Sequence, residues 1–136
     1  MKNKKITPFM MFNGKAEAAI EFYTSVFRNS EIISIIKYDE QGPGAPGTVN
    51  HAVFTIHNEQ FMAIDNANGT DIPFTPALSF VVECESAEEI EFLYDQLKEN
   101  GQVLMELAPM APVSEKFAWV ADQFGINWQL NLPLEV

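Results

Sequence analysis

The feature that most constrains the fold is an internal repeat with a spacing of 70 residues. One segment over 15–28 and another beginning at Ser86 carry apolar residues three and four positions apart, which predicts two amphipathic helices. A shift of 70 positions places Ile20-Glu21-Phe22 on Ile90-Glu91-Phe92. A chain made of two copies of one unit has few folds available, because each copy must bury its helix in the same way.

The segments around each helix repeat as well. Runs rich in β-branched and aromatic residues predict one strand before each helix and three after it. They lie at 6–12, 31–38, 49–57 and 61–65, and again at 76–83, 102–106, 115–121 and 126–132. We therefore predict an α+β protein of two βαβββ modules, at 6–65 and 76–132, joined by a polar linker at 66–75. Because about 60 residues bury little core alone, the modules are expected to pack as a single domain over 1–136.

Charge and composition exclude several classes of partner. The 136 residues include 8 Lys or Arg and 19 Asp or Glu, for a formal net charge of −11. This charge repels nucleic acid phosphates and anionic membrane surfaces, so neither is an expected partner. No apolar run approaches the ~20 residues of a membrane span. Cys84 is the single cysteine, which excludes a disulfide within the chain and is typical of a reducing compartment; we predict a cytoplasmic protein.

Two local patterns predict how the chain turns. Ser86 and Glu89 have the spacing of a capping box at the start of the second helix, and Gly101 is predicted to end that helix in a left-handed conformation. Residues 42–47 match G-x-G-x-x-G, but Pro43 and Pro46 have no N–H to offer a phosphate and a strand follows instead of a helix. We interpret this segment as a hairpin loop that could serve as a lid or a subunit contact.

The aromatic and histidine positions indicate which faces of the strands could line a cavity and which pack on a helix. Alternation places Phe117 and Trp119 on one face of their strand, and we predict that Trp128 lies on the opposite face, toward a helix. His51 and His57 lie six residues apart on one extended segment, about 20 Å from each other, so they cannot bind one metal ion. His51 is a candidate for a cavity, whereas His57 is expected in a solvent-exposed turn.

Several segments together resemble a known family. Residues 6–17 (ITPFMMFNGKAE), Phe22-Tyr23, 61–65 (FMAID) and 114–130 (SEKFAWVADQFGINWQL) are similar to the PhnB-like branch of the vicinal oxygen chelate superfamily. This superfamily includes glyoxalase I, bleomycin-resistance proteins and extradiol dioxygenases, and many members of the branch carry the label 3-demethylubiquinone 3-methyltransferase. The resemblance implies paired βαβββ modules whose strands form a curled, cup-shaped mixed sheet around a small ligand, commonly in a homodimer.

The same resemblance lets the superfamily's metal ligands be compared position by position. Its usual ligands are two histidines and a glutamate. The corresponding positions here are Pro8, one of 76–78 (Pro, Ala and Leu), and Gln129. One neutral amide oxygen cannot hold a divalent ion, so we expect no metal and no other cofactor. The methyltransferase label also lacks support, because the chain shows no glycine-rich turn between a strand and a helix.

We therefore predict a small-molecule-binding protein without a metal. The predicted ligand-binding residues are those expected to point inward from the strands, apart from Pro8. They are Met10, Phe12, His51, Asp65, Phe117, Trp119 and Gln129. The alternative is a metal-independent enzyme in which Asp65 or Glu115 acts as general base with His51 as its partner.

Overall fold

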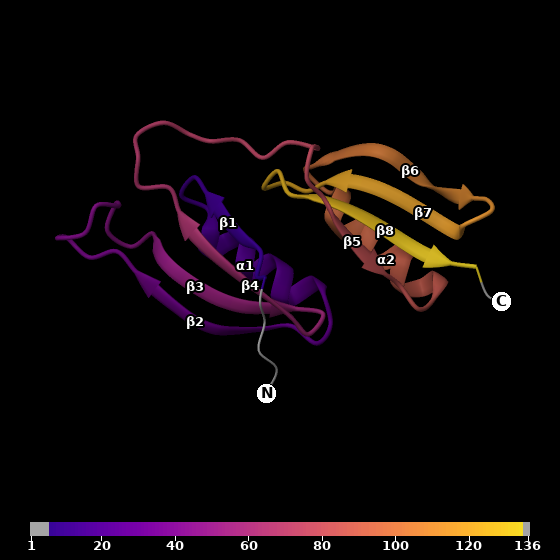
Figure 1. Cartoon of the computed structure of the whole chain (residues 1–136), viewed down its shortest axis with the longest axis horizontal. Helices are drawn as coiled ribbons and strands as arrows, with labels where there is room; N and C mark the ends of the chain where they lie inside the picture. Colours follow the sequence, from indigo (N-terminus) through magenta and orange to yellow (C-terminus); the bar gives the residue numbers. More distant parts are fainter. Residues whose placement is uncertain (1–5, 135–136) are drawn as a thin grey trace. The chain divides into compact units, whose positions relative to one another are not determined.

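The chain folds into two βαβββ modules in a computed structural model that describes residues 6–134 (Figure 1). The first module contains β1 (Phe9–Phe12), α1 (Ala16–Val26), β2 (Glu31–Lys37), β3 (Val49–Ile56) and β4 (Glu59–Asp65). The second contains β5 (Phe80–Glu83), α2 (Ala87–Lys98), β6 (Gln102–Met110), β7 (Ser114–Ala121) and β8 (Asn127–Pro133). Residue contacts divide the chain into two compact units between Ile72 and Pro73. The packing of both modules as one domain stays a prediction.

Each module forms one four-stranded mixed sheet with the same topology. The strand order is β1-β4-β3-β2 in the first module and β5-β8-β7-β6 in the second. The first and last strands of each module pair in parallel, and the remaining neighbours are antiparallel. The repeated order confirms the predicted α+β class and the two βαβββ modules.

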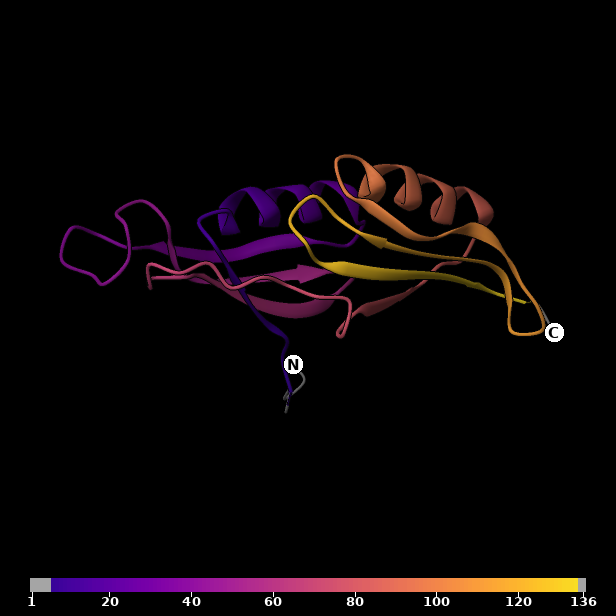
Figure 2. The same cartoon turned by 90° about the horizontal axis from the view of Figure 1, so that it is seen from above.

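The first core lies between α1 and one face of its sheet (Figure 2). Ala19, Ile20 and Tyr23 of the helix are fully buried, and Phe54 of β3 and Ala63 of β4 meet them from the sheet. Figure 2 also shows that no helix of this module covers the opposite face of its sheet. Burial is therefore one-sided, as the alternating pattern of β3 and β4 indicates.

The second core repeats this arrangement under α2. Ile90 and Leu97 of the helix are fully buried, as are Val120 of β7 and Leu130 of β8, while Trp128 is 1% exposed. Ile90 occupies the position that the 70-residue shift assigns to Ile20, which is also fully buried. The helical repeat in the sequence therefore reflects two equivalent helix–sheet contacts.

The second helix begins as predicted but ends differently. Ser86 Oγ accepts from the Glu89 N–H at 3.1 Å, while Glu89 Oε1 accepts from the Glu85 N–H, one residue before the N-cap. The left-handed residue after the helix is Asn100, with φ of 60°, so the prediction for Gly101 is wrong. Gly101 is needed for close packing instead, because a Cβ there would lie 2.2 Å from the Ala121 carbonyl oxygen.

The glycine-rich loop at 42–47 connects two antiparallel strands, β2 and β3, as expected for a hairpin loop. Gly42 and Gly44 pack on the buried ring of Tyr38, where a Cβ on Gly44 would lie 2.3 Å from the ring, and Gly47 has a left-handed φ of 88°. The Tyr38 hydroxyl donates to the Asp65 carbonyl oxygen at 3.4 Å. The loop therefore needs glycine for packing on Tyr38, which accounts for the motif without a bound phosphate.

Among the residues that the structure describes, no helix is long and apolar enough to cross a membrane.

Candidate functional site

The candidate site is the face of the second sheet that α2 does not cover, which we call the open face of the second module. The register pairs Trp119 of β7 with Gln129 of β8, and Gln129 in turn with Val81 of β5. Two residues away on each strand, Phe117 of β7 pairs with Asn131 of β8. These side chains share one face because directly paired residues of neighbouring strands point to the same side of a sheet.

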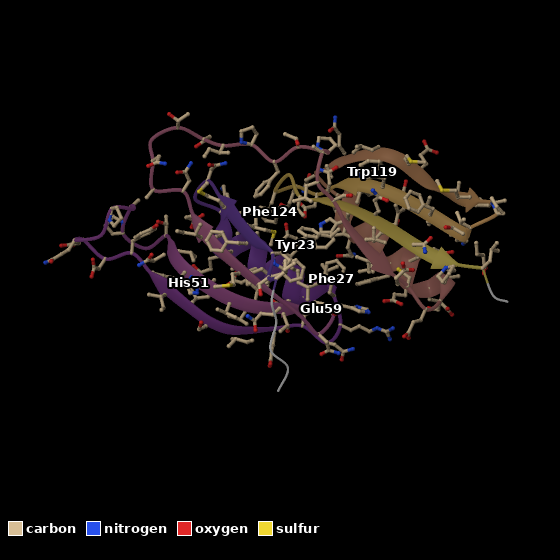
Figure 3. The ribbon with its side chains drawn as sticks, in the orientation of Figure 1. Tyr23, Phe27, His51, Glu59, Trp119 and Phe124 are labelled. Atoms are coloured by element: carbon tan, nitrogen blue, oxygen red, sulfur yellow. The ribbon has the colours of Figure 1, made fainter. Side chains whose placement is uncertain are left out.

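The two tryptophans lie on opposite faces, as predicted. Trp128 pairs with Val120 and Phe80 on the face covered by α2, and its Nε1 donates to Asp122 Oδ2 at 2.8 Å. Trp119 is half-buried on the open face, labelled in Figure 3, and its Nε1 donates to Asn127 Oδ1 at 3.1 Å. The hydrogen bond to Asn127 fixes one edge of the Trp119 indole and leaves a half-exposed aromatic surface on this face.

A row of amides runs beside Trp119 along β8. Asn127, Gln129 and Asn131 alternate onto this side of the sheet, where Asn127 is 3% exposed and the other two are half-buried. Gln129 Nε2 donates to Ser79 Oγ at 2.9 Å, and Asn131 Nδ2 donates to Glu83 Oε1 at 2.8 Å. Asn131 Oδ1 also accepts from the Ser114 hydroxyl. These bonds orient the amides, so the face combines an aromatic surface with positioned neutral polar groups.

Only Gln129 of this row was singled out from the sequence. Asn127 and Asn131 were missed, although both lie two residues from Gln129 and strand alternation assigns them to its face. The pattern N-x-Q-x-N on one strand was the available signal. It was obscured because Trp128, Leu130 and Leu132 alternate with it and make the segment apolar overall.

Positive charge is absent from the open faces within residues 6–134. Lys37 and Lys116 are the described cationic residues on strands. Lys37 lies 3.0 Å from Glu17 of α1, and Lys116 lies 2.6 Å from Glu91 of α2. Both ammonium groups therefore point to the helix-covered side, and a ligand on the open face meets no lysine or arginine of the described strands.

The open face of the first module is more apolar. His51 lies there, labelled in Figure 3, and pairs with Ile36 of β2. Phe9 pairs with Met62, and Met11 with Ile64, on this same side. His57 lies in the β3–β4 turn with φ of 55°, and it is half-buried instead of solvent-exposed as expected.

Met10 and Phe12 do not face the open side, and the expectation for them is wrong. Their side chains are 4% and 2% exposed and pack in the first module's core. Met10 pairs with the fully buried Ala63, whereas Phe9 and Met11 occupy the other face. All four residues of β1 are apolar, so the sequence contains no alternation that distinguishes the faces.

Asp65 also faces the helix and has a structural role. Its carboxylate is 2% exposed; Oδ1 accepts from the Gly14 and Ala16 N–H groups at 2.9 and 3.0 Å, and Oδ2 accepts from the Val49 N–H at 2.9 Å. Asp65 and His51 therefore lie on opposite faces of the sheet. This arrangement removes Asp65 as the general base that would pair with His51 in a metal-independent enzyme.

Glu115, the other candidate base, lies elsewhere on the second module. It is exposed and lines a shallow depression of about 440 Å³ at the start of α2, together with Cys84 and Ser86. None of the predicted ligand-binding residues lines this depression. We place the candidate site on the open face, because several oriented polar groups and Trp119 converge there.

The residues at the superfamily's metal positions do not fit a divalent ion. The Pro8 carbonyl oxygen accepts from the Met62 N–H at 2.9 Å, and Leu78 has no donor atom in its side chain. Gln129 offers one neutral amide whose nitrogen is bonded to Ser79. Within residues 6–134, no group of three or more His, Cys, Asp or Glu side chains could hold a metal.

Comparisons with known proteins agree with the fold. A family model described as 3-demethylubiquinone-9 3-methyltransferase matches residues 4–131. A Bacillus cereus structure described as a 3-demethylubiquinone-9 3-methyltransferase, PhnB protein, is 50% identical, with 95% of this chain and 99% of that chain covered and a TM-score of 0.90. No curated protein matches the chain.

Two more distant structures share the fold alone. A fosfomycin resistance protein from Listeria monocytogenes is 12% identical, with a TM-score of 0.65 over 98% of this chain and 96% of that chain. A glyoxylase/bleomycin resistance protein/dioxygenase domain from Frankia is also 12% identical, with a TM-score of 0.66 over 98% of this chain and all of that chain.

Proposed function

Since the chain belongs to the PhnB-like, 3-demethylubiquinone-9 3-methyltransferase family of the vicinal oxygen chelate superfamily, we propose that it binds a small organic molecule on the open face of its second module. The observation that carries this proposal is the partly exposed Trp119, which pairs with the oriented amide of Gln129 and is held at its Nε1 by the buried Asn127. An apolar surface with a few positioned polar groups is the usual composition of a ligand site.

The charges favour a neutral or cationic ligand with a planar apolar part. The described strands direct Lys37 and Lys116 to the helices, so no lysine or arginine of these strands balances an anionic ligand on the open face. Glu83 lies on the same face, and its carboxylate would attract a positively charged group of the ligand near Asn131. A flat ring suits Trp119 and Phe117, because aromatic side chains stack on planar groups.

Native mass spectrometry of freshly purified protein tests this function. We expect a retained neutral or cationic molecule whose occupancy falls at least about tenfold in Trp119→Ala, because a stacked aromatic contact and its area contribute more than about 1.4 kcal/mol. Phe92→Ala is the matched control, since Phe92 is an exposed aromatic on α2, and it should retain the molecule. Equal retention in Trp119→Ala, or an anion as the retained molecule, contradicts the proposal.

Binding is proposed to need no metal and no other cofactor. Pro8 and Leu78 supply no ligand side chain, and Gln129 alone is too weak a ligand for a divalent ion. We expect less than about 0.1 divalent ion per chain by elemental analysis after mild dialysis, because a single neutral oxygen cannot retain one. About one zinc, nickel, iron or manganese per chain contradicts this expectation.

No methyl transfer is proposed, despite the family's description. The chain's one glycine-rich motif, 42–47, packs on Tyr38 between two antiparallel strands. The phosphate- and cofactor-binding loops of nucleotide-type folds instead lie between a strand and a helix, where backbone N–H groups face the ligand. Binding is thus the function that the observed side chains support best.

The assembly and compartment remain proposals as well. A homodimer is supported by the exposed apolar residues on the outer strands, including Ile33 and Ile36 of β2. A cytoplasmic location is supported by Cys84, a buried thiol that is the single cysteine of the sequence and so forms no disulfide within the chain.

A further inference from the structure

The sequence contains three asparagine–glycine pairs, Asn13-Gly14, Asn68-Gly69 and Asn100-Gly101. In such a pair the backbone nitrogen of the glycine can attack the side-chain carbonyl carbon of the asparagine, because glycine has no Cβ to hinder the approach. The attack requires a glycine N–H that is free of hydrogen bonds and an asparagine side chain that is free to rotate. The fold meets these two requirements differently at the three pairs.

The pair Asn13-Gly14 is held at both residues. The Gly14 N–H donates to the buried Asp65 carboxylate at 2.9 Å. Asn13 Nδ2 donates to the Ile72 carbonyl oxygen at 3.0 Å, and Asn13 Oδ1 accepts from the Ile72 N–H at 3.1 Å and from Asn66 Nδ2 at 3.2 Å. Attack at this pair therefore requires the loss of several hydrogen bonds at once.

The pair Asn100-Gly101 is held at its glycine. The Gly101 N–H donates to the Lys98 carbonyl oxygen at 2.9 Å. The backbone of Gly101 also lies so close to Ala121 that an added Cβ would be 2.2 Å from the carbonyl oxygen of that residue. Although Asn100 is exposed, the nitrogen beside it must first lose its hydrogen bond in a tightly packed segment.

The pair Asn68-Gly69 has neither restraint. Both residues are exposed in the loop between β4 and β5 (Figure 1). Among contacts within residues 6–134, the Gly69 N–H donates no hydrogen bond and the Asn68 side chain has no hydrogen-bond partner. The loop's local hydrogen bond uses the Asn68 N–H instead, which donates to Asn66 Oδ1 at 2.8 Å. Both the attacking atom and the attacked group are thus available in the folded protein.

We propose that Asn68-Gly69 is a site of spontaneous deamidation in the folded protein. The Gly69 nitrogen forms a bond to Cγ of Asn68, and the bond from Cγ to the side-chain nitrogen breaks. That nitrogen leaves as ammonia with the proton of the Gly69 N–H, and a cyclic succinimide remains. Water then adds to one of the two carbonyl carbons of the ring, which gives aspartate or isoaspartate. No oxidant, metal or enzyme is needed.

The product alters the connection between the two modules. Aspartate at position 68 adds one negative charge to a chain whose formal net charge is already −11. Isoaspartate also inserts the side-chain CH₂ group into the backbone, so the loop becomes longer by one atom. This inference concerns the loop alone and does not depend on the proposed ligand.

Peptide mass spectrometry after incubation of the full chain at mildly alkaline pH tests the proposal. We expect the peptide with Asn68 to gain one mass unit at least about tenfold faster than the peptide with Asn100, because the Gly101 N–H must first be released by local opening. The peptide with Asn13 should react most slowly. Digestion at mildly acidic pH keeps the pairs from reacting during the analysis, and fragmentation distinguishes isoaspartate from aspartate.

The same incubation in concentrated urea is the control for intrinsic reactivity. Unfolding releases all three glycine N–H groups, so the three rates should become similar. Equal rates at the three pairs in the folded protein overturn the proposal. So does an unchanged Asn68 peptide in the folded protein when the urea sample reacts.

Gly69→Ala tests the attacking atom. A Cβ on Gly69 meets nothing within 4 Å and the residue does not need a left-handed φ, so the variant should fold normally. The added methyl group hinders the nitrogen, and deamidation of Asn68 should slow several-fold while the rate at Asn100 stays the same. An unchanged rate at Asn68 in Gly69→Ala contradicts attack by the Gly69 nitrogen.

Discussion

Trp128→Ala is expected to lower the free energy of unfolding by about 3–5 kcal/mol. The indole is 1% exposed, its ring lies 5.6 Å from that of Phe80, and its Nε1 donates to the buried Asp122 carboxylate. Removing it leaves a large cavity under α2 and takes a donor away from Asp122. Urea denaturation followed by circular dichroism measures the loss.

Trp119→Ala is the matched control, because it removes the same side chain from the opposite face of the sheet. Trp119 is half-buried, so its truncation should cost clearly less stability than that of Trp128. The interpretation of the two faces fails if Trp119→Ala is the more destabilising variant, or if both cost the same.

Asp65→Ala is expected to lower the free energy of unfolding by a similar amount, about 3–5 kcal/mol, although Asp65 contacts no ligand. The buried carboxylate accepts from the N–H groups of Gly14, Ala16 and Val49. Each buried donor left without an acceptor costs about 1–3 kcal/mol, and two of the three belong to the start of α1. The loss should therefore appear in both unfolding free energy and helix content.

Two further variants separate the role of Asp65 from a general charge effect. Asp65→Asn keeps one acceptor oxygen and should lose less stability than Asp65→Ala. Asp95→Ala removes an exposed carboxylate paired with Lys98 and should change stability by less than about 0.5 kcal/mol. A loss below about 1 kcal/mol in Asp65→Ala contradicts the structural role assigned here.

The repeat made most of the fold predictable from the sequence. Helical spacing around Ile20 and Ile90 and the strand runs beside them gave the element order, because amphipathic patterns report which face is buried. Strand alternation also assigned Trp119 and Trp128 to opposite faces of the sheet, because polar Gln129 lies directly beside Trp128 in the sequence. Boundaries were less accurate at the strand predicted for 76–83, of which only Phe80–Glu83 is a strand.

The facing of β1 and the role of Asp65 could not be predicted from local patterns. In Phe-Met-Met-Phe every residue is apolar, so only the pairing of Met10 with buried Ala63 decides which side packs against α1. Asp65 ends an apolar strand and looks like a site carboxylate. Its partners, Gly14 and Ala16, are about 50 residues away in the sequence, and only the folded chain brings them together.

The two indole N–H resonances of ¹⁵N-labelled protein test the central claim most directly. The sequence contains two tryptophans, and the Trp119→Phe variant assigns the signals. During titration with small neutral and cationic aromatic amides and amidines, or with the molecule recovered by mass spectrometry, we expect the Trp119 signal to shift saturably while that of Trp128 stays in place. A saturable shift of Trp128 alone, or no shift of Trp119 by any ligand that binds, contradicts a site on the open face of the second module.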